Sequence, residues 1–277
     1  MTYHRGMGHI PDPQRFVQAE NATRSLAGLV GAGGPSVMPT MRHAHLLDRI
    51  LDQGGTSSCV GCALSTAVYL RGAFLGYGLR RPSAKGIYDV ARLVDRPGGS
   101  VFDTGCQPRA AMLGVQEYGM VAEERWPLFA PSDEEARAYA PDGTAASWID
   151  ALPPFDVFKE GADALLTGYY RADTGDIVLQ LKRALVAGHF PLFAMHVRPD
   201  YQDVAGSEVY EASGPPDTGL PSHMQAICGY DEAAVDVVSS WGRGHGTAGI
   251  VRVSWDIVAS AWSFGRMVVT AVPVTTR

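Results

Sequence analysis

The chain has 277 residues, of which 46% are hydrophobic and 19% charged, a composition that suits one globular unit of two lobes or two small domains sharing a cleft. A net charge of −6 and the absence of a basic stripe argue against a nucleic-acid partner. No stretch approaches the roughly 18 apolar residues of a membrane span, and the N-terminus lacks the apolar core of a secretory signal. We therefore expect a cytoplasmic protein with no membrane partner.

Residues 1–36 end in the flexible stretch Gly31–Pro35 and are expected to form an N-terminal arm or short leader. The remainder, 37–277, is expected to be one domain. Its first part, the helical lobe at about 50–128, has helix patterns over 59–75 and 83–94. A third helix is expected from Pro108 to the residue before Gly119.

After residue 130 the pattern changes. A short helix is expected after Pro131–Glu135, and an amphipathic helix runs from Asp176 to Gly188. A β-rich lobe at about 165–277 is predicted, and the fold class is α+β. The strand-like segments are 190–197, 224–229, 235–239, 250–254 and 266–274.

Cys59 is the residue with the clearest chemical meaning. It begins the apolar helix pattern, where the positive end of the helix dipole lowers the pKa of a thiol and raises its thiolate fraction. Gln53 lies six residues earlier, and its side-chain amide can direct an N–H donor toward the position of the Cys59 thiol. A thiolate and an amide donor are half of a nucleophile and oxyanion-hole arrangement, which still requires a base.

The base is expected to be His223, which begins a strand and would lie at a sheet edge facing a cleft. Farther along, a strand ends at Ser239, Ser240 and the bulky Trp241. Regularly spaced glycines then carry a tight loop into the next strand, which includes Arg252.

In this order the pieces resemble the papain-like cysteine peptidases, over roughly residues 37–275. The resemblance rests on the spacing of Gln53 and Cys59, on His223 followed six residues later by Gly229-Tyr230, and on the Ser-Trp-Gly motif with its glycine and arginine pattern up to Arg252. Other segments are similar to the bacterial and viral branch that lacks a long inhibitory propeptide. They include Arg81–Ala84, Asp103–Arg109 and Glu117–Gly119 with Trp126-Pro127.

The resemblance implies a papain-like two-lobed fold, with a helical lobe, an antiparallel barrel-like β lobe and an active-site cleft between them. It implies that Cys59 is the nucleophile, that His223 is its acid–base partner, and that Gln53 and the Cys59 N–H form the oxyanion hole. Trp241 would shield the histidine from water. The substrate would be a peptide or protein, with no metal or cofactor. By analogy with propeptides, residues 1–36 are a hypothetical inhibitory cover.

Two positions depart from the family pattern. Ser239 stands where the family has the asparagine that orients the histidine, so we expect a weaker orienting hydrogen bond. His245 stands where the family usually has a second tryptophan near the leaving group, which either changes leaving-group preference or has no visible effect.

Candidate substrate-binding residues are less specific. Ser222 and Met224 flank His223 and are candidates for the main specificity pocket, together with Trp241. Asp103, Thr104 and Gly105 either line the groove for the substrate backbone or form a helix-capping loop, and the capping interpretation is favoured.

Two alternatives to a peptidase stay open. Cys59 and Cys62 match the Cys-x-x-Cys pattern of thiol–disulfide oxidoreductases, although the segment before them is loop-like rather than a strand. Otherwise Cys62 and Cys228 are small core residues, and Cys106 and Cys228 lack the neighbouring ligands of a zinc site. Ser239 also fits a catalytically weakened binding module for peptides or a protein partner.

Overall fold

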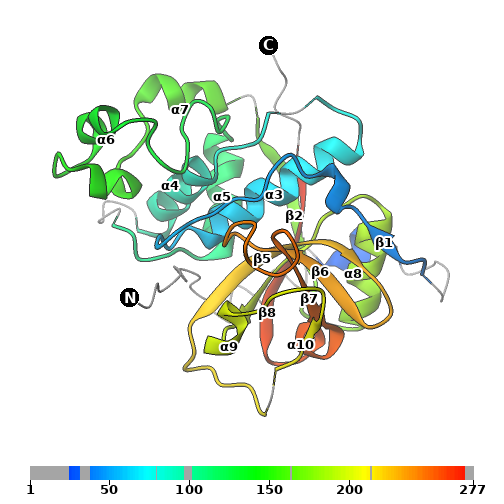
Figure 1. The fold of residues 1–277 in the computed structure, drawn as a ribbon. Coiled ribbons are helices and arrows are strands. Elements are labelled where there is room, and N and C mark those ends of the chain that lie inside the picture. The colour runs from blue at the N-terminus through cyan, green and yellow to red at the C-terminus, as the bar shows by residue number, and fades with distance from the viewer. Residues whose placement is uncertain are drawn as a thin grey trace.

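The computed structural model describes residues 25–31, 38–78, 80–96, 102–162, 164–212 and 214–271. Helices gather in one region of the molecule and the sheet lies in the other (Figure 1). The helical region contains α3 (Cys59–Phe74), α4 (Ala84–Asp95), α5 (Pro108–Tyr118), α6 (Asp133–Tyr139) and α7 (Phe155–Gly161), with short 3₁₀ turns at Ala44–Leu46 and Ala145–Asp150.

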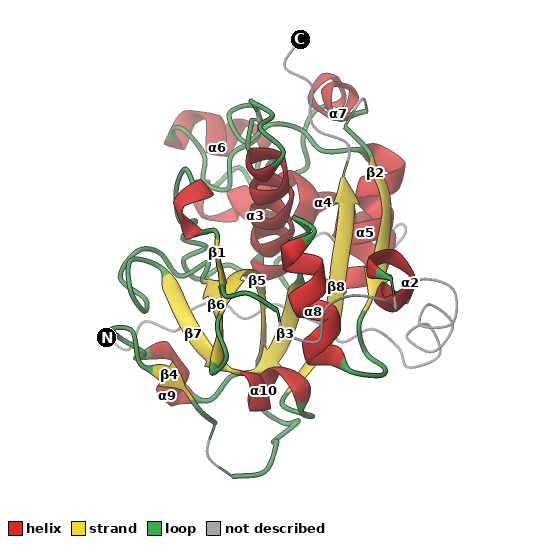
Figure 2. Ribbon diagram, turned by 90° about the vertical axis from the view of Figure 1, so that its right-hand side faces the viewer, coloured by secondary structure: helices red, strands yellow, loops and turns green. Residues whose placement is uncertain are grey.

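Within the described residues, eight strands form one sheet whose main path is β2-β8-β3-β5-β6-β7-β4, with β1 paired to β5. All the pairings are antiparallel except β4 with β7. The strands are β1 (Met41–Arg42), β2 (Leu166–Arg171), β3 (Leu192–His196), β4 (Val209–Tyr210), β5 (Ser222–Tyr230), β6 (Ala234–Val238), β7 (Ile250–Ser254) and β8 (Ser263–Ala271). Helices α8 (Ile177–Val186), α9 (Pro199–Gln202) and α10 (Trp255–Ala259) accompany them (Figure 2).

The predicted α+β class is confirmed. Side-chain caps begin four of the described helices, α10 among them, where Ser254 accepts a hydrogen bond from Asp256 N–H. Ser83 accepts a hydrogen bond from Gly86 N–H at the start of α4, Ser132 accepts one from Glu135 at α6, and Asp176 accepts one from Leu179 at α8. The sequence analysis missed β2 and the helices α7, α9 and α10.

Helix α3 joins the two regions because it packs on α4 along one side and on β5 along the other. Almost every residue from Cys59 to Leu70 is buried, as expected for a helix that is apolar on all sides. Gly61 permits this packing. A Cβ atom built on it would lie 2.2 Å from the carbonyl oxygen of Ala84.

The N-terminal arm contributes one short helix to the described residues, α2 (Leu26–Val30). α2 packs on α8 and β2, Leu26 belongs to the hydrophobic core, and Arg183 donates a hydrogen bond of 3.0 Å to the carbonyl oxygen of Gly31. Residues 25–31 are therefore docked on the β-rich region. The other residues of the expected arm, 1–24 and 32–36, lie outside the described residues. No helix in the described ranges is long and apolar enough to cross a membrane.

We predict that Gly61→Ala lowers the free energy of unfolding by about 1–3 kcal/mol, because the added methyl group forces α3 away from α4. Urea unfolding measures the effect. The matched control is Gly78→Ala, where nothing lies within 4 Å of the added methyl. Equal stability of the two variants would contradict the close α3–α4 contact.

Candidate active site

Cys59 is the first residue of α3 and is fully buried. Ser58 precedes it at the N-cap, where its hydroxyl makes no capping bond to the helix. That hydroxyl instead pairs with the Thr56 hydroxyl at 2.7 Å and lies 3.8 Å from the sulfur of Cys62. The sulfur of Cys59 therefore begins a 16-residue helix at the end where the dipole favours a negative charge.

The side-chain amide of Gln53 is fixed at both ends. Its Nε2 donates to the carbonyl oxygen of Thr56 at 2.7 Å, and its Oε1 accepts a hydrogen bond from the Ser240 hydroxyl. These partners determine the amide orientation, since a carbonyl only accepts and the hydroxyl can donate. The nitrogen end therefore lies toward the turn that leads into Cys59.

A short antiparallel seam connects this turn to the sheet. Gln53 N–H donates to Ser240 C=O at 2.7 Å, and Gly242 N–H donates to Leu51 C=O at 3.1 Å. Asp52 and Trp241 face each other between these two bonds. The seam brings the residues before α3 beside the residues after β6, although nearly 190 positions separate them in the chain.

His223 lies near the start of β5 and is fully buried. At His223 the strand is paired with Met195 of β3, whereas its pairing with β6 begins only at Ala226, so His223 lies at the end of β5 beyond the reach of β6. Its imidazole stacks on the Trp241 indole with ring centroids 4.4 Å apart and planes inclined by 27°.

These contacts form a continuous path. Trp241 stacks on His223, the seam joins Trp241 to Asp52 and Gln53, and the bonds of Gln53 through Thr56 lead to the N-terminus of α3. Three distant segments thus come together in one buried cluster. The expected water-shielding contact between Trp241 and His223 is present as a stack.

Ser239 has partners that the sequence analysis did not anticipate. Its hydroxyl oxygen accepts a hydrogen bond from Trp241 N–H at 3.2 Å and lies 2.8 Å from Nδ1 of His245. His245 is buried, and its Nε2 lies 2.7 Å from the carbonyl oxygen of Tyr201. Ser239 and His245, the two departures from the family pattern, are therefore bonded to each other.

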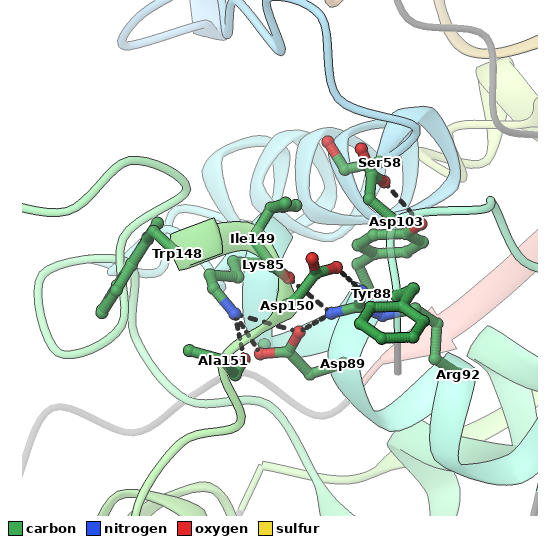
Figure 3. A network of polar contacts seen from close by, with 12 residues as sticks. Ser58, Lys85, Tyr88, Asp89, Arg92, Asp103, Trp148, Ile149, Asp150 and Ala151 are labelled. Carbon is green, nitrogen blue, oxygen red and sulfur yellow. Dashed lines mark hydrogen bonds and ion pairs between the residues drawn. The ribbon is translucent and has the colours of Figure 1, made fainter. Parts of the chain in front are cut away.

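Asp103 supports the turn before the nucleophile from the other side. Its carboxylate accepts the N–H of Ser57 at 2.9 and 3.0 Å and the hydroxyl of Tyr88 at 2.8 Å (Figure 3). Tyr88 in turn accepts the N–H of Gly105 at 2.9 Å. The favoured helix-capping interpretation of this loop is wrong for α5, whose N-cap residue is Gln107. Asp103 instead restrains the turn of the chain that precedes Cys59.

A buried charge network lies next to Tyr88 in Figure 3. Asp89 pairs with Lys85 at 2.9 Å and with Arg92, whose guanidinium also lies over the Tyr88 ring at 4.2 Å. Lys85 and Arg92 donate to the carbonyl oxygens of Ala151 and Ile149. Burial lowers the pKa of Lys85 to about 8, against the opposing effect of Asp89. This network ties α4 to the segment that covers it.

The candidate specificity residues differ in position. Met224 and Ser222 follow and precede His223 on β5, so their side chains point to the opposite face of the strand. Both are buried, Met224 completely. Gly105 is buried in the Asp103 loop with a φ of +82°, a value that favours glycine.

The chemistry of Cys62 does not favour a redox pair. Its thiol is fully buried, and burial raises its pKa far above the ordinary value, which keeps it protonated. Cys59 and Cys62 are both free thiols, and the residues before them form a turn rather than a strand. Within the described ranges, no group of three or more His, Cys, Asp or Glu side chains is arranged to hold a metal ion.

The fold matches solved cysteine proteases along most of its length. Xylellain, a cysteine protease from Xylella fastidiosa, is similar at 22% identity with a TM-score of 0.76, and the match covers 97% of each chain. Digestive procathepsin L 3 from Tenebrio molitor matches at 17% identity and a TM-score of 0.62, over 98% of this chain and 83% of that one. The bromelain protease from Ananas comosus, solved with the E64 inhibitor, matches at 17% identity and a TM-score of 0.60, over 84% and 99% of the chains.

The chain therefore has the papain-like fold. No protein-family model and no curated protein matches it in sequence.

We predict that Asp103→Asn loosens the turn before Cys59, because an amide nitrogen would replace one of the two carboxylate oxygens that accept the Ser57 N–H. Amide hydrogen exchange of residues 56–59 should accelerate, with a stability loss of about 1–3 kcal/mol. The control is Asp142→Asn, an exposed carboxylate that accepts bonds within its own loop. Unchanged amide exchange at residues 56–59 would show that Asp103 does not stabilise the turn before Cys59.

Proposed function

We propose that this protein is a cysteine peptidase that hydrolyses peptide bonds through a thiolate–imidazolium pair of Cys59 and His223. The observation that carries the proposal is the contact path from His223 through Trp241 and the seam to Gln53 and the N-terminus of α3. The papain-like fold supports it, because xylellain, which shares this architecture, is a cysteine protease and bromelain is a protease.

In the proposed reaction the Cys59 thiolate attacks the carbonyl carbon of the scissile bond. The Gln53 amide and the Cys59 N–H stabilise the negative oxygen of the tetrahedral intermediate. The C–N bond then breaks, the His223 imidazolium gives its proton to the leaving amine, and a thioester remains. Water attacks the thioester, His223 takes the proton of the water, and release of the acid regenerates the ion pair.

The geometry supports particular roles for the neighbours of this pair. The fixed amide of Gln53 favours an oxyanion donor that needs no reorganisation during the reaction. Trp241 would keep water from the imidazole. We assign peptide binding to the surroundings of Gly105 and Trp241, and an orienting role to Ser239; Ser222 and Met224 point to the other face of β5 and are not assigned to it.

We predict that Cys59→Ala abolishes hydrolysis of a peptide library and also the labelling by a peptidyl epoxide directed at thiols. With residues 1–24 removed, Cys59 should be labelled far faster than a simple thiol, because a thiolate is the reactive form and the hypothetical N-terminal cover is then absent. Mass spectrometry of the labelled peptide identifies the site.

The matched control is Cys62→Ala, which removes the buried thiol one turn farther along the same helix. A peptidase requires that this variant keep its activity within a few-fold. An equal loss in both variants, with turnover of a dithiol substrate by the wild type, would support the oxidoreductase alternative. Labelling of Cys59 at the rate of a simple thiol, both in the full chain and after deletion of residues 1–24, would favour a binding module.

A cover over the site is part of the proposal. Cys59 and His223 are both 0% exposed, so a peptide cannot reach the sulfur unless something moves. We assign the role of this movable cover to the N-terminal segment, which would act as an inhibitory arm. Leu26 is in the core, so the part to remove ends before α2.

We predict that deletion of residues 1–24 raises the rate of peptide hydrolysis and of Cys59 labelling by at least several-fold. The deletion retains α2 and its core residue Leu26, so the fold should survive. The control is Leu26→Ala in the full chain, which should lower stability without a comparable gain in rate. A truncated protein that is folded and no more active than the full chain would show that the arm does not inhibit.

A further inference from the structure

A buried polar cluster packs against Trp241. Its members are Ser239, His245, Tyr201 and Gln225, each at most 1% exposed. Buried polar groups of this kind are costly unless they are bonded to one another. The cluster therefore has a structural or functional reason to exist in this fold.

Hydrogen-bond chemistry determines the state of His245. A carbonyl oxygen can only accept, so the 2.7 Å contact with Tyr201 C=O requires a proton on Nε2. In the neutral ring Nδ1 is then the acceptor, and the Ser239 hydroxyl donates to it at 2.8 Å. Because the hydroxyl proton is used in this bond, the Ser239 oxygen can act only as an acceptor toward its other neighbours.

One of those neighbours is the backbone N–H of Trp241, at 3.2 Å from the Ser239 oxygen. The indole of Trp241 also packs against the His245 ring at 4.9 Å and against the Tyr201 ring at 5.6 Å. The indole also stacks on the His223 ring, with centroids 4.4 Å apart. The position of the indole on His223 therefore depends on both the hydrogen bond from its backbone and the ring of His245.

The cluster returns to the strand that carries His223. The hydroxyl of Tyr201 donates to Oε1 of Gln225. Gln225 lies two residues after His223 on β5, and side chains two apart point to the same face of a strand. The path from His223 through Trp241, Ser239, His245, Tyr201 and Gln225 therefore begins and ends on one strand.

We propose that His245 is a positioning residue for His223 that acts through Ser239 and Trp241. As a neutral imidazole it accepts the hydrogen bond of the Ser239 hydroxyl, leaves the serine oxygen as an acceptor for Trp241 N–H, and packs on the indole that stacks on the His223 ring. The Ser239–His245 pair thereby acts on His223 through Trp241. The inference rests on the proposed function, in which His223 is the acid–base partner of Cys59.

The test separates hydrogen bonding from packing at residue 245. His245→Phe keeps a ring against Trp241 and Tyr201 but removes both hydrogen bonds. We expect kcat to fall about 10- to 100-fold with KM changed less than about threefold, because the group acts on the reacting pair and not on substrate binding. His245→Gln restores one amide donor and one acceptor, and we expect it to recover activity to within about fivefold of the wild type.

The matched control is Tyr210→Phe, which removes a hydrogen bond to Asp200 at the edge of the same aromatic cluster. It should lower stability without affecting kcat. All variants are compared as folded proteins, with circular dichroism and urea unfolding as the check. If folded His245→Phe keeps the wild-type kcat, or if His245→Gln is as impaired as His245→Phe, the positioning role is overturned.

A second readout works whether or not peptides are hydrolysed. The rate at which iodoacetamide alkylates Cys59 below pH 6 reports the thiolate held by His223. We expect His245→Phe to lower this rate several-fold and His245→Gln to restore it. An unchanged rate in His245→Phe overturns the inference. A wild type that alkylates rapidly at Cys59 but hydrolyses no peptide instead contradicts the proposed function and leaves the positioning role measurable.

Discussion

The structure depends most on the seam at Asp52 and Trp241, where the chain before α3 is bonded to the chain after β6. Two backbone bonds and the Ser240–Gln53 side-chain bond cross it, and each contributes about 1 kcal/mol net when buried. Their larger effect is geometric. The same few residues fix the oxyanion-donor candidate on one side and the indole that stacks on His223 on the other, so neither can shift without the other.

The helical region supplies a rigid frame for the nucleophile. Asp103 restrains the Ser57 N–H, Tyr88 links that carboxylate to α4, and the Arg92 guanidinium lies over the Tyr88 ring. Behind them the buried ions around Asp89 are paired and bonded to backbone carbonyls, which offsets the cost of removing them from water. Loss of a single partner would leave a buried charge unpaired, which typically costs about 3–5 kcal/mol.

Local signals explain what the sequence predicted. The uniformly apolar run after Cys59 and the caps at Ser83 and Asp176 are properties of short segments, and the helices they predicted are present. β2 was missed because Gly168 interrupts its pattern and its register with β8 is set about 100 residues away. The partners of Asp103 and His245 were missed for the same reason. Ser57 is 46 positions from Asp103, and Tyr201 is 44 positions from His245, so no spacing rule connects them.

The substitution of serine for asparagine at position 239 has a physical consequence that a motif comparison overlooks. An asparagine carbonyl is always an acceptor, whereas a serine hydroxyl can donate or accept according to its neighbours. A serine alone can therefore present either role to its neighbours. A buried neutral imidazole whose Nε2–H donates to a backbone carbonyl removes this ambiguity, because its Nδ1 can then only accept the hydrogen bond of the serine hydroxyl. Replacement of the second tryptophan by His245 is thus chemically coupled to the replacement at Ser239, and each residue is understood only with the other.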